Sequence, residues 1–134
     1  MSAELGVDEI AIAIESEQDI VTARQRGREL AASTGFRGTD QTLIATAISE
    51  VARNIIVHAG SGELTIRIAC ERGRLGIVIV ASDRGPGILD PALALRGGAG
   101  AGTGLPRARR MVDELELTSA PGSGTVVALR KWLQ

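Results

Sequence analysis

The chain has 134 residues, of which 44% are hydrophobic and 1% aromatic, and its formal net charge is −1. This length predicts one domain over residues 1–134, and without a basic field or aromatic stacking surfaces nucleic acid is not an expected partner. The single cysteine, Cys70, excludes an internal disulfide, and the lack of a signal peptide or a long apolar run favours a cytoplasmic protein with no membrane partner.

A strand and a helix are predicted at the start of the chain. Isoleucines occupy alternate positions from Ile10 to Ile14, which is the period-two pattern of a strand. Acidic residues follow Ser16 and suit the positive end of a helix, which we expect to end near Gly35. A connector over residues 36–40 then leads to a second helix.

The second helix carries a polar line beside an apolar stripe, and we expect it to stop at Gly60. The stripe consists of Ile44, Ile48, Val51 and Ile55. Glu50, Asn54 and His58 follow one another at i, i+4 and i+8, so they lie along one side of the helix. Such a line can border a cleft, but the residues alone favour a solvated face on which Glu50 pairs with its neighbours Arg53 or Asn54.

The second half of the chain predicts a hairpin, a helix and two closing strands around a loop rich in Gly and Pro. The expected segments are strands at 64–68 and 75–81, a loop at 84–104, a helix at 106–114, and strands at 115–119 and 125–132. The whole order is strand, helix, helix, strand, strand, helix, strand, strand. This order predicts the α/β class, as a two-layer sandwich with helices packed on one face of a mixed sheet.

The segment 82–87 directly follows the apolar strand of the predicted hairpin and contains Asp83, Gly85 and Gly87. An Asp at a strand end can accept a hydrogen bond from an exocyclic amine, and glycine lets the backbone approach a flat ring. The same residues also make ordinary turns. Taken alone, this segment is a weak indication of a binding site.

Glycines at positions 100, 102 and 104 stand just before a predicted helix, where backbone N–H groups can turn toward an anion. A P-loop requires a lysine after the last glycine, and the only lysine in the chain is Lys131. The Rossmann spacing and the eukaryotic protein-kinase motifs are absent as well. Phosphate binding here would therefore use backbone N–H groups, with arginine or a metal ion balancing the charge.

Together and in this order, these segments resemble the GHKL (Bergerat-fold) ATP-binding family. Residues 50–54 resemble its N-box, 83–87 its G1 box, 100–105 its G2 box and 124–125 its last box. Residues 19–25, 47–55 and 104–106 further resemble the RsbT subgroup of this family, which comprises switch kinases of bacterial stress signalling. The likeness covers nearly the whole chain.

The resemblance implies ATP and Mg²⁺ as cofactors and assigns roles to positions. Glu50 would be the general base for the attacking hydroxyl, Asn54 a Mg²⁺ ligand, and Asp83 the acceptor for the adenine amine. Residues 88–103 would form a lid, although 96–103 are richer in Gly and Ala than the family pattern suggests. The other expected nucleotide-binding positions are Gly85, Gly87, Gly100, Gly102, Thr103, Gly104, Leu105 and Thr125.

The resemblance also implies partners. The chain would be a serine/threonine protein kinase that phosphorylates a small STAS-domain protein (RsbS-like) and, once released, activates a PP2C-type phosphatase (RsbU-like). Two alternatives remain open: an anti-sigma factor that binds a sigma subunit directly, and a nucleotide-gated binding module without turnover. The oligomeric state is open too, with a homodimer as one option.

Overall fold

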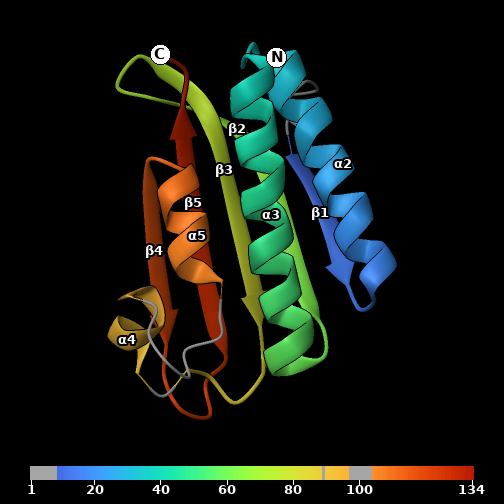
Figure 1. Cartoon of the computed structure of the whole chain (residues 1–134), viewed down its shortest axis with the longest axis vertical. Coiled ribbons are helices and arrows are strands. Elements are labelled where there is room, and N and C mark those ends of the chain that lie inside the picture. Colours follow the sequence, from blue (N-terminus) through green and yellow to red (C-terminus); the bar gives the residue numbers. More distant parts are fainter. Residues whose placement is uncertain (1–8, 89, 97–103) are drawn as a thin grey trace.

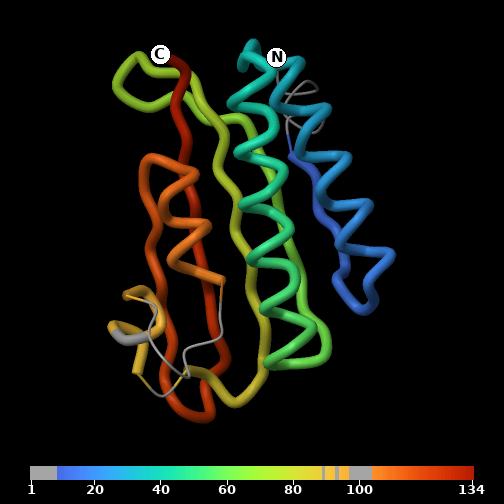
Figure 2. The backbone as a smooth tube through the Cα atoms, viewed as in Figure 1, coloured from blue at the N-terminus to red at the C-terminus, as the bar shows by residue number. Residues whose placement is uncertain are grey.

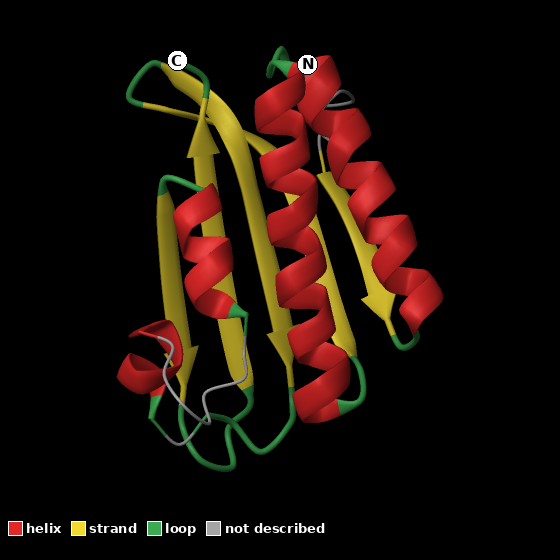
Figure 3. Ribbon diagram, in the orientation of Figure 1, coloured by secondary structure: helices red, strands yellow, loops and turns green. Residues whose placement is uncertain are grey.

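The protein is built from two layers, a β-sheet and the helices α2, α3 and α5 that lie over one of its faces (Figures 1 and 3). The computed structural model describes residues 9–88, 90–96 and 104–134. In chain order the elements are β1 (Glu9–Ile14), α2 (Glu17–Thr34), α3 (Gly38–Ala59), β2 (Gly62–Glu71), β3 (Arg74–Asp83), α4 (Pro91–Arg96), α5 (Leu105–Met111), β4 (Glu114–Ser119) and β5 (Thr125–Trp132). The expected two-layer α/β class is confirmed.

The strands form one sheet in the order β1-β2-β3-β5-β4. All four pairings are antiparallel, so the described sheet is antiparallel throughout rather than mixed as expected. The reason lies in the connections. Because α2 and α3 form a helical hairpin, the chain re-enters the sheet at β2 running opposite to β1, and α5 with β4 has the same effect between β3 and β5 (Figure 1).

Every predicted strand and helix is present, but some bounds differ: β2 and β3 are both longer than the expected strands at 64–68 and 75–81. The second helix begins at Gly38, inside the expected connector, and α4 forms within the expected loop. The third helix ends at Met111, earlier than expected, because the chain then turns into the sheet: Asp113 Oδ2 accepts a hydrogen bond from Trp132 N at 2.8 Å. None of the described helices combines the length and the apolar character that a membrane span requires.

The apolar stripe fixes α3 against the sheet. Its members Ile44, Ile48, Val51 and Ile55 are each at most 2% exposed, as their spacing predicted. Sheet residues buried in the same core include Leu64, Ile66, Ile77, Ile79 and Leu129. Beside it in the same layer (Figure 1), α2 approaches so closely that a Cβ atom at Gly27 would collide with the Ile48 side chain. The polar line of α3 is therefore carried by a closely packed helix.

The segments that resemble the G1 box (83–87) and the last box (124–125) lie together at one end of the molecule. Figure 2 shows the C-terminal ends of α3 and β3 at this end, beside the turn between β4 and β5. A backbone hydrogen bond from Gly122 N to Pro86 O, 2.7 Å long, joins that turn to the loop after β3. The fold thus brings together residues far apart in the sequence.

Candidate active site

A cavity of about 20 Å³ lies between α3 and the sheet at this end of the molecule. Its lining comes from five segments: Val51, Asn54, Ile55 and His58 on α3, Ala81 and Asp83 on β3, Ile88 in the following loop, Leu105 on α5, and Thr125 and Val127 on β5. A mostly apolar wall with a few polar groups is typical of a small-molecule site. Asn54, Asp83 and Thr125, which the sequence singled out for nucleotide binding, all meet at this cavity.

Asp83 is the last residue of β3 and lies opposite Thr125 of β5 in the strand register. Its Oδ1 accepts a hydrogen bond from Gly85 N at 2.8 Å, which fixes the orientation of the carboxylate. Within the described part of the chain, Oδ2 has no hydrogen-bond partner. A half-buried carboxylate with one oxygen fixed and the other open can accept a hydrogen bond from a ligand amine.

The two glycines after Asp83 allow close approaches within the protein. A Cβ atom at Gly85 would lie 2.6 Å from Ala59 Cβ, so the loop is pressed against the end of α3. Gly87 has a φ of +83°, and a Cβ atom there would collide with the carbonyl oxygen of Ala120. The close contact at Gly87 is thus with the turn between β4 and β5, and its expected approach to a ring stays a prediction.

Ser119, which the sequence did not single out, connects three segments of the site. Its Oγ accepts a hydrogen bond from Ile88 N at 2.7 Å and donates one to Gly124 O at 2.9 Å. The same oxygen lies 2.9 Å from Thr125 Oγ1. Ser119 therefore ties the loop after β3 to the start of β5, and no local sequence signal marks a serine for that role.

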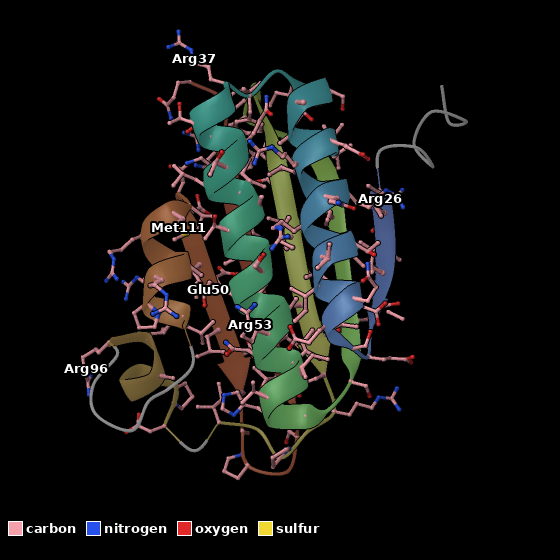
Figure 4. The ribbon with its side chains drawn as sticks, turned by 45° about the vertical axis from the view of Figure 1, so that its right-hand side comes forward. Arg26, Arg37, Glu50, Arg53, Arg96 and Met111 are labelled. Atoms are coloured by element: carbon pink, nitrogen blue, oxygen red, sulfur yellow. The ribbon has the colours of Figure 1, made fainter. Side chains whose placement is uncertain are left out.

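Glu50 is held by an ion pair with Arg107 on α5. The Arg107 Nε donates to Glu50 Oε2 at 3.0 Å, and its Nη2 donates to Glu50 Oε1 at 3.2 Å. The Glu50 side chain is only 13% exposed, and Figure 4 shows it between α3 and α5. For Glu50 the solvated-face interpretation is therefore wrong, and so is a pairing with Arg53 or Asn54, because its partner comes from 57 residues away; His58, at the end of the same line, is exposed.

The ion pair also acts on Arg107. The hydrogen bond to Glu50, and after it the coulombic attraction of the carboxylate, raises the pKa of the Arg107 guanidinium above its ordinary value. Arg107 therefore stays charged, and the pair is not broken by titration of the arginine near neutral pH.

Gly104 and Leu105 join this group at the start of α5. Gly104 precedes the helix with a φ of +70°, and a Cβ atom there would collide with Glu50 Oε1. Leu105 is fully buried and lines the cavity. The expected phosphate-binding positions Gly100, Gly102 and Thr103 lie outside the described residues.

The chemistry of Asn54 fits a magnesium ion that is shared with a nucleotide. Its half-buried side chain lines the cavity and has no hydrogen-bond partner among the described residues. Those residues contain no group of three or more His, Cys, Asp and Glu side chains that could hold a metal alone. Mg²⁺ commonly takes one or two protein oxygens and completes its shell with phosphates and water, so one amide oxygen suffices.

A second hollow, of about 440 Å³, lies at the same end of β2 and β3. Its lining consists of Ser61, Gly62, Glu63, Ser82, Asp83 and Arg84. None of these side chains supplies an apolar wall for a flat ring, whereas the cavity under α3 does. The smaller cavity is therefore the better candidate for a nucleotide base.

Comparison with known proteins assigns this arrangement to a family. Residues 14–131 match the model of the histidine kinase-like ATPase domain. The chain therefore belongs to the histidine kinase-like ATPase domain family, the class that the four sequence boxes indicated.

Two relatives and one solved structure describe its place within that family. The chain is 44% identical over 131 residues to the serine/threonine-protein kinase RsbT of Bacillus subtilis (strain 168). The aligned region covers 95% of this chain and 98% of that protein. It is 34% identical over 100 residues to the anti-sigma F factor of Caldanaerobacter subterraneus subsp. tengcongensis, with coverage of 67% and 68%. The histidine kinase domain of a blue-light activated kinase from Erythrobacter litoralis EL346 shares the fold, with a TM-score of 0.54, 20% identity, and coverage of 85% of this chain and 59% of that one.

Proposed function

We propose that this protein is a serine/threonine protein kinase that binds Mg-ATP in the cavity between α3 and the sheet. In this proposal the γ-phosphoryl group passes to a hydroxyl of a STAS-domain partner. Membership of an ATPase domain family supports ATP as the nucleotide. Similarity to a protein named as a serine/threonine kinase, over 98% of that protein's length, supports transfer to a hydroxyl. The observation that carries the proposal is the meeting of Asn54, Asp83 and Thr125 at one cavity.

Each polar group of the cavity has a task in this proposal. Asp83 Oδ2 accepts a hydrogen bond from the adenine amine, and Thr125 supports the ring from β5. Asn54 would hold Mg²⁺ through its amide oxygen, and the ion would neutralise charge on the phosphates. The backbone from Gly100 to Gly104 presents N–H groups to those phosphates. Phosphoryl transfer needs positioning and charge neutralisation above all, and these groups supply both.

Glu50 is the proposed general base. It stands one helical turn before Asn54 on α3 and does not line the cavity, so its carboxylate would lie near the phosphates that a Mg²⁺ ion on Asn54 would hold. A base at this place can take the proton from an incoming serine hydroxyl. Such a group contributes roughly 10²–10⁴ in rate.

Transfer of label from γ-labelled ATP to a panel of STAS-domain proteins, followed by mapping of the phosphorylated residue, tests the function. Glu50→Gln keeps the shape but not the base, so we expect transfer to fall by about 10²–10⁴ while Mg-ATP affinity stays the same. Glu29→Gln is the matched control, because Glu29 lies on α2 with a side chain 74% exposed. Equal loss of binding and transfer in Glu50→Gln would refute the role of Glu50, and no transfer to any STAS protein would favour a binding module without turnover.

A second candidate function is direct binding of a sigma subunit. The observation in its favour is similarity to proteins named anti-sigma F factor, at 32–34% identity over about two thirds of this chain. Co-purification of the chain with a sigma subunit would support it. Stimulation of a PP2C-type phosphatase by the chain would instead support the switch-kinase proposal.

A further inference from the structure

We propose that Arg107 is the positioning residue for the Glu50 base and that it couples the orientation of this base to the placement of α5. The proposal rests on the proposed function, because it assumes that Glu50 takes a proton in phosphoryl transfer. It assigns a role in phosphoryl transfer to a second residue, which lies on α5 and outside the four sequence boxes. Three observations support it.

The first observation is the geometry of the ion pair. Two different nitrogens of Arg107 reach two different oxygens of Glu50, at 3.0 Å and 3.2 Å. A guanidinium that binds a carboxylate through both oxygens fixes the plane of the carboxylate as well as its position. A lone ammonium or a single donor would leave the carboxylate free to rotate.

The second observation is that the start of α5 bounds the same carboxylate from another side. Glu50 Oε1 lies against Gly104, where any side chain would collide with it. Leu105 and Ala108, both fully buried, anchor α5 on either side of Arg107 in the sequence. Gly104 and Arg107 therefore move as one body with α5, and a shift of this helix carries the Glu50 carboxylate with it.

The third observation is the unequal burial of the two partners. The Glu50 side chain is 13% exposed, whereas the Arg107 side chain is 60% exposed. An exposed arginine contributes little to folding stability through an ion pair. Glu50, by contrast, has no other hydrogen-bond partner among the described residues. The main consequence of the pair is thus a fixed orientation of Glu50 rather than stability.

A double-mutant cycle tests the coupling. Wild type, Arg107→Ala, Glu50→Gln and the double variant are compared for kcat and for the KM of ATP, with the STAS-domain protein that the wild-type chain phosphorylates as acceptor. We expect Arg107→Ala to lower kcat about tenfold or more with the KM of ATP changed less than about twofold. In the Glu50→Gln background the same change should lower kcat less than about twofold, because the residue to be positioned is already gone.

Two further variants control for charge and folding. Arg109→Ala removes an exposed arginine of the same helix that forms no ion pair with any described residue, and it should keep wild-type kcat. Arg107→Lys keeps the charge without the fork, so it should recover only part of the lost rate. It also serves as the informative variant if Arg107→Ala does not fold.

The outcomes separate this inference from the proposed function. If the effects of Arg107→Ala and Glu50→Gln multiply in the double variant, or if Arg107→Ala mainly raises the KM of ATP, Arg107 acts on the nucleotide and the inference is overturned. Wild-type kcat in Arg107→Ala also overturns it. If Glu50→Gln itself transfers phosphate at the wild-type rate, the role of Glu50 as base fails first.

Discussion

The helices α3 and α5 each supply one partner of the Glu50–Arg107 pair, yet they are built in opposite ways. α3 has 22 residues and a fully apolar stripe buried against the sheet, with α2 packed beside it. α5 has 7 residues, and it starts at a glycine in the left-handed conformation. The long helix can therefore serve as a fixed frame, whereas the short helix is held by two fully buried residues, Leu105 and Ala108.

The size of the cavity bears on which part of the site is fixed. It measures about 20 Å³, whereas ligand pockets generally measure about 300–1,000 Å³. Binding of a nucleotide base therefore requires some lining side chains to move. The walls from α3 and the sheet belong to a close-packed core, which resists such movement. Ile88 lies in the loop after β3 and is only half-buried, so it forms the side that can yield.

Ile48→Ala should have the largest effect on stability, because it damages the fixed frame. The side chain is fully buried between α2 and the sheet, so we expect the free energy of unfolding to fall by about 2–5 kcal/mol. Urea denaturation measures this change. Val57→Ala on the same helix is the control, since Val57 is 64% exposed and its truncation should change stability by no more than about 0.5 kcal/mol. Similar values for both variants would mean that α3 is not the frame.

Gly87→Ala should have a smaller effect, because it loosens the loop side of the site. The added methyl group would collide with the Ala120 carbonyl at a φ of +83°. Gly122→Ala is a matched control, since Gly122 has a φ of +79° but no atom within 4 Å of an added Cβ. We expect Gly87→Ala to lose about 1–3 kcal/mol more than Gly122→Ala, with faster hydrogen exchange at Ile88. Equal losses would show that the contact between this loop and the turn is unimportant.

Asp83→Asn should have the smallest effect, and only on binding. An amide has one oxygen where the carboxylate has two, so it cannot accept from both Gly85 N and an adenine amine. We expect the affinity for Mg-ATP to fall about tenfold, or about 1.4 kcal/mol, in titration calorimetry. Asp19→Asn at the start of α2 should leave the affinity unchanged. Wild-type affinity in Asp83→Asn would place the adenine site elsewhere.

The comparison of α3 with α5 also explains what the sequence could predict. The stripe of α3 and the alternation of the strands follow from local periodicity, and both were confirmed. The pairing of Glu50 with Arg107 and the bridging role of Ser119 depend on contacts across the fold, which no local pattern encodes. The strand directions likewise depend on the helical hairpin of α2 and α3, and for that reason the expected mixed sheet was wrong in this detail.

The central claim is that Mg-ATP binds between α3 and the sheet, and an NMR titration of the ¹⁵N-labelled protein tests it most directly. Saturating Mg-ATP should shift the Asn54 side-chain amide and the backbone amides of Gly85, Gly87 and Gly104, and leave those of β1 unchanged. Shifts confined to the distant hollow lined by Glu71, Arg72, Arg74, Glu114 and Trp132, or no shifts at all, would contradict the claim.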